Sequence, residues 1–259
     1  MTAALYLDDS GGAGEPVVLL HSGGMSGGQW RRLSGELVAA GKRVLAVDLV
    51  GHGRSAPWPE PEPFSFEIDV DRVGELVRGL GAAHVVGHSY GGLIAMQVAR
   101  RAPERIRTLA VFDPVTFGVL DLEHHPDPEL SALDLASWST EPEARERWLR
   151  TFVEFWSGAG SWSGLRREVA DEFRRVSWVI HEGVRTLMAD RTPASAYAAI
   201  TAPALAMTGE LSPRAAQRVV AAVAAALPHA RHVTIAGAGH LAPVTHARDV
   251  NAHVLALLG

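Results

Sequence analysis

Short apolar runs, many of them β-branched, recur along the chain, and amphipathic stretches separate them. Apolar runs bounded by turn residues predict buried strands, and apolar residues spaced three and four apart predict helices. The predicted strands cover residues 5–7, 17–21, 43–48, 84–87, 107–113, 204–208 and 232–236. The predicted helices cover residues 29–40, 66–80, 90–101, 213–227 and 247–258.

This alternation of strands and helices with short connections predicts an α/β fold, a mostly parallel, doubly wound sheet covered on both faces. The alternation stops between residues 115 and 200, a stretch without a convincing strand that holds five of the seven tryptophans. We expect residues 1–114 and 201–259 to form the core. Residues 115–200 are expected to form a helical cap, inserted after the strand that ends at Asp113 and placed above the sheet.

The composition excludes several classes of protein. A chain of 259 residues that is 47% hydrophobic can bury a large core, and its net charge of −5 argues against binding to nucleic acid or an anionic membrane. The acidic N-terminal stretch and the lack of a long apolar run predict no signal peptide and no membrane anchor, and a cytoplasmic location. No cysteine is present, so disulfides and thiolate nucleophiles are excluded.

Two stretches match the pattern Gly-x-Ser-x-Gly, residues 24–28 around Ser26 and residues 87–91 around Ser89. Ser89 directly follows a predicted strand and opens a predicted helix, a turn that leaves its side chain alone above the sheet edge. The alternative role for Ser89 is an ordinary helix N-cap. Ser26 lies in a glycine-rich loop well past the end of its strand. The context therefore favours Ser89 as a nucleophile.

With these motifs in place, the chain resembles the α/β-hydrolase superfamily over nearly its whole length, with the insertion in the position of the family's variable cap. Four stretches carry the resemblance in the family's order, residues 21–24, 48–55, 87–91 and 237–240. The resemblance implies a serine hydrolase with a catalytic triad and an oxyanion hole. It implies no metal and no cofactor.

His240 is the predicted base, since a serine hydroxyl needs one and His240 follows the last strand and a Gly-Ala-Gly turn, where the family places its catalytic histidine. His88 is expected to point into the core, and His52 to support a loop. The pair His124 and His125, near acidic residues, could suggest a metal site, but a solvated surface is the favoured interpretation.

By resemblance, the oxyanion donors are the backbone N–H groups of Tyr90, just after the nucleophile, and of Gly23, in the loop after the strand at residues 17–21. Ser22 stands where the family usually has a glycine. The strand ends and the cap also supply the expected substrate-binding residues, His21, Ser22, Trp138, Trp156 and Trp178.

The acid of the triad departs from the family pattern. The usual position, three residues beyond the glycine after the penultimate strand, holds Ser212, which cannot stabilise an imidazolium as a carboxylate does. Asp113, at the end of the strand after the nucleophile's helix, is favoured, because some branches of the superfamily draw their acid from that strand end. Glu210 is the alternative acid.

The predicted function is hydrolysis of a small, apolar carboxylic ester or lactone through an acyl-enzyme. The same triad could instead serve C–C bond hydrolysis, a hydroxynitrile lyase or a perhydrolase. A noncatalytic ligand receptor on the same fold is the third hypothesis. Haloalkane dehalogenase and epoxide hydrolase chemistry is disfavoured, because relatives that perform it need a carboxylate nucleophile. A homodimer is left open as the assembly.

Overall fold

The computed structural model describes residues 4–122, 124–133 and 135–259. Among these residues, seven strands form one sheet in the order β1-β3-β2-β4-β5-β6-β7, in which β1 alone runs antiparallel to its neighbour. The strands are β1 (Tyr6–Asp9), β2 (Pro16–Leu20), β3 (Arg43–Asp48), β4 (Ala83–His88), β5 (Ile106–Phe112), β6 (Ala204–Gly209) and β7 (Ala230–Ile235). The predicted α/β class with a mostly parallel, doubly wound sheet is confirmed.

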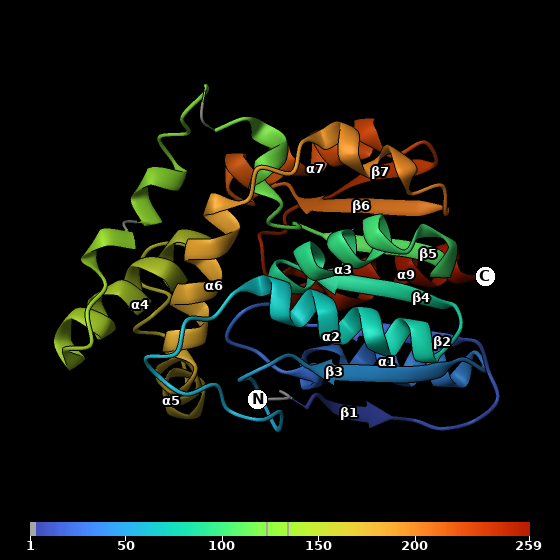
Figure 1. Cartoon of the computed structure of the whole chain (residues 1–259), viewed down its shortest axis with the longest axis horizontal. Coiled ribbons are helices and arrows are strands. Elements are labelled where there is room, and N and C mark those ends of the chain that lie inside the picture. The colour runs from blue at the N-terminus through green and yellow to red at the C-terminus, as the bar shows by residue number, and fades with distance from the viewer. Residues whose placement is uncertain (1–3, 123, 134) are drawn as a thin grey trace.

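Helices cover both faces of the sheet (Figure 1). One face packs against α2 (Phe66–Gly79), α3 (Tyr90–Arg101) and α7 (Arg214–Ala226), and the other against α1 (Arg31–Ala39) and α9 (Ala247–Leu258). Successive strand residues alternate between the two faces, as the pleat requires. In β2, for example, Val18 and Leu20 join the first cluster and Val17 and Leu19 the second.

The predicted strands and helices agree with the structure to within two residues at each end. The predictions for residues 43–48, 90–101 and 247–258 match β3, α3 and α9 end to end. The helix predicted at residues 29–40 begins instead with a 3₁₀ turn, Gly27–Trp30, before α1.

A group of helices lies beyond the carboxyl ends of the parallel strands, at the left of Figure 1. It comprises α4 (Pro142–Ser157), α5 (Arg167–Arg175) and α6 (Ser177–Ala189), preceded by short 3₁₀ turns between residues 117 and 137. These helices share a core that includes Trp148, Phe173 and Ile180. The group falls within residues 115–200, the segment that the sequence analysis assigns to a cap.

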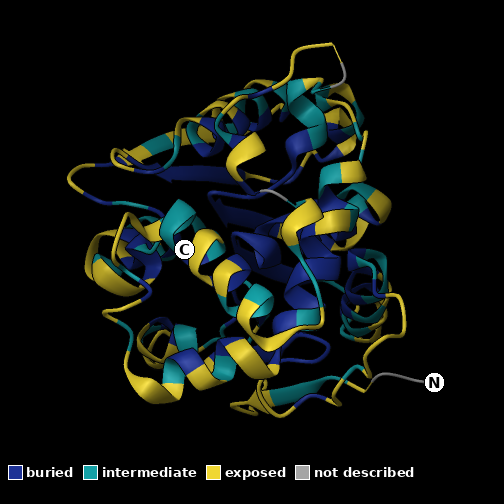
Figure 2. Cartoon of the chain, turned by 90° about the vertical axis from the view of Figure 1, so that its left-hand side faces the viewer, coloured by how far each residue is buried: buried dark blue, intermediate teal, exposed yellow. Residues whose placement is uncertain are grey.

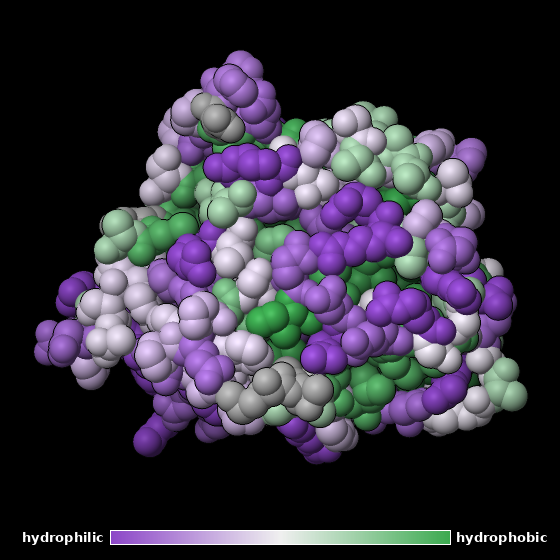
Figure 3. Space-filling view, viewed as in Figure 1, coloured by the Kyte–Doolittle hydropathy of each residue, from purple (hydrophilic) through white to green (hydrophobic). Residues whose placement is uncertain are grey.

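The surface combines hydrophilic and hydrophobic residues. In Figure 2 the strands are largely buried and the helices turn their exposed sides outward, and in Figure 3 hydrophilic and hydrophobic residues are interspersed on one face. A short helix, α8 (Ala242–Thr245), precedes α9. Within the part of the chain that the structure describes, no helix is both long and apolar enough to cross a bilayer.

Candidate active site

Ser89 occupies a strained turn between β4 and α3. Its backbone has φ 54° and ψ −116°, a conformation that L-residues rarely adopt. The turn depends on two glycines, because a Cβ on Gly87 would lie 2.4 Å from the carbonyl oxygen of Gly91, and a Cβ on Gly91 would lie 2.4 Å from that of Leu20. Although Ser89 is the N-cap residue of α3, its hydroxyl makes no capping hydrogen bond.

His240 and Asp113 meet at the carboxyl edge of the sheet. His240 Nδ1 lies 3.0 Å from Asp113 Oδ2, and both side chains are buried. Because a carboxylate accepts, Nδ1 carries the proton and Nε2 is left as the acceptor that a base needs. His240 and Ser89 line the same cavity. The structure therefore brings together the three residues predicted as nucleophile, base and acid.

The Asp113 carboxylate is held by two hydroxyl groups as well as by His240. Ser212 Oγ donates to Oδ2 and Thr208 Oγ1 donates to Oδ1, both at a distance of 2.6 Å. Ser212 Oγ in turn accepts from the backbone N–H of Gly209 at 3.2 Å, which turns its proton toward the carboxylate. The serine at the family's usual acid position thus contacts Asp113, the predicted acid.

Glu210, the alternative acid, is exposed, and its Oε2 accepts from the backbone N–H of Gly237 at 2.7 Å. That contact ties the turn after β6 to the turn after β7. Within the described residues Glu210 makes no hydrogen bond to His240, so the geometry favours Asp113.

His88 is buried, as expected, and it contacts His240, the predicted base. Its Nε2 donates to the backbone carbonyl of His240 at 2.9 Å, and the two rings lie 4.9 Å apart. Burial lowers the pKa of His88 well below its ordinary value, so the ring stays neutral at physiological pH. His88, the residue before Ser89, therefore helps to fix the loop that carries His240.

The two expected oxyanion donors lie beside Ser89. Gly23 and Tyr90 line the cavity that contains Ser89, and a Cβ on Gly23 would lie 4.0 Å from Cβ of Tyr90. Since α3 begins at Tyr90, its N–H has no acceptor four residues earlier within the helix. The N-terminus of α3 also favours negative charge at this point.

A chain of hydrogen bonds joins the loops that carry these two donors. Tyr90 Oη donates to Asp69 Oδ2 at 2.8 Å, and Asp69 Oδ1 accepts from Val50 N–H at 2.9 Å. His52 Nδ1 donates to the Val50 carbonyl at 3.0 Å, and its Nε2 accepts from Gly24 N–H at 3.2 Å. This neutral tautomer agrees with a His52 pKa that burial lowers to about 3.

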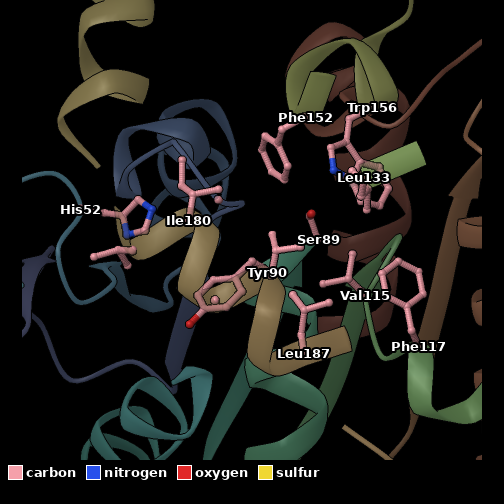
Figure 4. Close-up of a pocket in the computed structure, with 14 residues that line it drawn as sticks. His52, Ser89, Tyr90, Val115, Phe117, Leu133, Phe152, Trp156, Ile180 and Leu187 are labelled. Carbon is pink, nitrogen blue, oxygen red and sulfur yellow. The ribbon is translucent and has the colours of Figure 1, made fainter. Parts of the chain in front are cut away.

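Two cavities meet at Ser89. The first, of about 30 Å³, lies between the sheet edge and α6, and the second, of about 80 Å³, lies toward α4, α5 and His240. Figure 4 shows the Ser89 hydroxyl pointing toward Phe152 and Trp156, while the Tyr90 hydroxyl points away from it. The described residues that line both cavities are Gly23, Ser89, Phe152 and Trp156.

The residues predicted to bind substrate divide into two groups. Ser22 lines the second cavity and Trp156 lines both, with its ring stacked on His240 at a centroid distance of 4.1 Å. Ser22 also donates, through its N–H and its hydroxyl, to Gln29 Oε1, which fixes the loop where the family usually has glycine.

The prediction that His21 binds substrate needs correction, because His21 is fully buried and its two ring nitrogens hydrogen-bond to the backbone of Ser22 and Leu49.

Trp138 and Trp178 are also corrections, since neither is among the described residues that line the two cavities at Ser89. Trp138 stacks on His181 at 4.4 Å, and Trp178 Nε1 donates to the Glu62 carbonyl at 2.9 Å. Helical periodicity could not show which cap tryptophans face the sheet and which pack within the cap.

His124 and His125 are exposed, and His124 Nδ1 lies 2.8 Å from Asp121 Oδ1. Among the described residues no group of three or more metal-ligating side chains is placed to hold an ion. Glu123, one of the acidic neighbours that suggested a metal, lies outside the described residues.

Several residues of the site were missed by sequence reasoning. Thr208 and Ser212 reach Asp113 from β6 and the following turn, and Asp69 reaches Tyr90 from α2. Asp69 carried a signal, as a carboxylate on the buried face of its helix, and Ser212 stands at the family's usual acid position, but neither signal identified the contact. Contacts between distant segments leave no mark in the local pattern.

Comparison with known proteins agrees with this geometry. A family model described as the alpha/beta hydrolase fold matches residues 15–247. An enol-lactonase from Burkholderia xenovorans has a similar structure, with a TM-score of 0.73 and 22% identity over 98% of this chain and 96% of that one. At this identity the likeness shows the fold.

Two curated relatives extend the comparison. An esterase from Mycobacterium tuberculosis is 38% identical over 105 residues, 40% of this chain and 34% of the esterase, so the match spans about a third of that relative. A 2-hydroxy-6-oxononadienedioate/2-hydroxy-6-oxononatrienedioate hydrolase from Cupriavidus pinatubonensis is 26% identical over 98% of this chain and 90% of its own length.

Proposed function

Because this chain belongs to the alpha/beta hydrolase fold family, we propose that it is a serine hydrolase that cleaves carboxylic esters through an acyl-enzyme. The observation that carries the proposal is the hydrogen bond from His240 Nδ1 to Asp113, next to a serine on a strained turn that lines a cavity with His240. The esterase among the relatives supports the same class of substrate. Lactones, which are cyclic esters, fall within it.

The reaction begins when Ser89 Oγ attacks the carbonyl carbon and its proton passes to His240 Nε2. Asp113 stabilises the imidazolium that results, and the N–H groups of Tyr90 and Gly23 hold the oxyanion. The C–O bond then breaks, and His240 returns the proton to the leaving alcohol. Water, deprotonated by His240, attacks the acyl-enzyme in the same way and releases the acid and Ser89.

The cavity linings favour ester hydrolysis over the reaction of the dioate hydrolase. The substrate named for that relative carries two carboxylates, whose burial requires paired cations. Among the described residues, no lysine or arginine lines either cavity at Ser89. The hydroxynitrile lyase, perhydrolase and receptor hypotheses have no observation in their favour.

The proposal is tested with two matched serine variants, since Ser26 and Ser89 share the Gly-x-Ser-x-Gly pattern. Ser89→Ala should lower kcat on p-nitrophenyl acetate by about 10⁴-fold or more while the protein stays folded. Ser26→Ala should change it by less than about twofold, because Ser26 lies at the start of a 3₁₀ turn and makes no capping bond with its side chain. Substantial turnover by folded Ser89→Ala would refute the proposal.

A further inference from the structure

We propose that the space at Ser89 is divided into a short acyl chamber and a longer alcohol chamber, so that the preferred substrates join a short, uncharged acid to a larger apolar alcohol. The acyl chamber is the first cavity, beside Val115 and Leu187, and the alcohol chamber is the second, beside Leu165 and His240. The inference rests on the proposed function, because the roles of Ser89 and His240 orient the ester.

Two aromatic side chains of α4 separate the chambers. Phe152 and Trp156 line both cavities, together with Ser89 and Gly23, so the two spaces adjoin at Ser89 with these two rings between them. Trp156 is further fixed by its stacking on His240, with ring planes 27° apart. An ester bound at Ser89 therefore extends one substituent to each side of this wall.

Both chambers are uncharged. Among the described residues, neither lining includes Asp, Glu, Lys or Arg. His52, in the acyl chamber, is neutral because burial holds its pKa at about 3. Placing a carboxylate or ammonium group in such a space costs several kcal/mol without a partner, so both substituents are apolar near the scissile bond.

The proton transfer from His240 to the leaving group decides which chamber holds the alcohol and which the acyl group. When the tetrahedral intermediate collapses, His240 gives its proton to the leaving oxygen, so the alcohol must lie on the side of His240. His240 lines the second cavity and is not among the described residues of the first. The acyl group therefore extends into the first cavity, toward Val115 and Leu187.

The volumes of the two cavities then indicate how long an acyl chain and an alcohol each chamber can hold. A cavity of 30 Å³ has room for about two or three water-sized groups, which suits an acyl chain of on the order of two to four carbons. The alcohol chamber is larger, at 80 Å³, and shares Trp156, Ser157, His240 and Leu241 with a surface groove of about 550 Å³. The first cavity shares only Trp156 with that groove, within the described residues.

Two ester series test this division in the wild-type protein. With p-nitrophenyl esters, kcat/KM for the acetate or butyrate should exceed that for the octanoate by at least about tenfold, since one methylene too many already costs about that much in a closed pocket. With acetates, kcat/KM should rise from methyl to hexyl. A flat or reversed acyl series would overturn the inference.

A matched pair of leucine variants tests the assignment of each chamber. Leu187→Ala enlarges the acyl chamber and should raise the octanoate-to-acetate ratio of kcat/KM at least about tenfold. Leu165→Ala makes the same change in the alcohol chamber, and should leave that ratio within about twofold while altering the hexyl-to-methyl ratio. If each variant changed the other's series, the chambers would be assigned the wrong way round.

Val184→Ala is the second variant for the acyl chamber should Leu187→Ala fail to fold, because it removes less volume from the same lining. Labelling of Ser89 by a fluorophosphonate distinguishes failure of the chamber assignment from failure of the proposed function. Labelling and ester turnover without the expected chain-length preference would overturn the chambers alone. Absence of both labelling and turnover in folded protein would overturn the proposed function and the chambers with it.

Discussion

At the scale of single residues, the site is organised around the buried carboxylate of Asp113. Its two oxygens accept from Thr208, Ser212 and His240, and each donor comes from a different segment of the chain after β5. Hydrogen bonds to a charged acceptor are about twice as strong as neutral ones, so the three donors together fix the carboxylate's orientation. The carboxylate in turn orients the ring of His240 through their shared hydrogen bond.

Replacing this acid should be far more damaging than replacing its rival. Asp113→Asn should lower kcat by about 10⁴-fold, because an amide can favour the wrong tautomer of His240 and cannot stabilise its imidazolium. Glu210→Gln, a matched change in an exposed side chain, should alter kcat by less than about threefold. Steady-state kinetics on p-nitrophenyl acetate measure both, and the opposite ranking would make Glu210 the acid.

Ser212→Ala should have an intermediate effect. It removes one hydroxyl donor from Asp113 but leaves Thr208 and His240 in place, so kcat should fall about tenfold, as expected for one hydrogen bond to a charged group. KM should change little, because Ser212 is not among the described residues that line the two cavities at Ser89. A variant with unchanged kcat would show that Ser212 does not help to position the acid.

At the scale of elements, the connection between β4 and α3 is tightly constrained. Ten of the twelve residues of α3, from Tyr90 to Ala99, are buried, so the helix cannot move away from the sheet. Side chains larger than hydrogen at Gly87 or Gly91 would meet backbone oxygens at 2.4 Å. Close packing of this helix on its strand thus accompanies the strained turn that places Ser89 in the lining of the two cavities.

Gly91→Ala should therefore destabilise the protein by about 3 kcal/mol, at the upper end of the cost of overpacking, because backbone rather than a flexible side chain must move. Gly79→Ala, in α2, is the matched control, since a Cβ there meets nothing within 4 Å. It should be neutral or slightly stabilising, because alanine favours helix. Urea unfolding measures both; equal stabilities would contradict the role given to the packing.

The same elements show what sequence can and cannot supply. The order of strands and helices and the turn at Ser89 followed from apolar runs and from what stands at each strand end. The preference for Asp113 over Glu210 drew on the family resemblance as well. The contacts of His21, Trp138 and Trp178 did not follow, because periodicity places a residue on a face without saying what covers that face. The hydroxyl donors to Asp113 depend on two strands becoming neighbours in the sheet.

At the scale of the whole molecule, one buried carboxylate links three segments of the core. Asp69 in α2 accepts from Val50 after β3 and from Tyr90 at the start of α3. Burial raises the pKa of Asp69 to about 7 from an ordinary value of 3.8, although both donors oppose the shift. Between about pH 4 and 7 the folded state therefore holds a proton that the unfolded state has lost.

The stability of the protein should depend on pH accordingly. Because the folded form binds more protons, the free energy of unfolding should decrease as pH rises from 4 to 7, by up to about 1.4 kcal/mol per pH unit. Asp69→Asn does not titrate and should lack this contribution. Urea unfolding at pH 5 and 7 should show a smaller decrease for Asp69→Asn than for wild type.

Asp71→Asn, an exposed carboxylate on the same helix, is the control for that measurement and should keep the wild-type dependence. Identical pH dependence in wild type and Asp69→Asn would mean that Asp69 is ionised throughout this range.

The central claim, that Ser89 is an activated nucleophile, is tested most directly by reacting the folded protein with a fluorophosphonate and locating the adduct by peptide mass spectrometry. A single adduct on Ser89 is expected, abolished in Ser89→Ala, retained in Ser26→Ala and strongly slowed in Asp113→Asn. An adduct on another residue, or undiminished labelling of Ser89→Ala, would contradict the account.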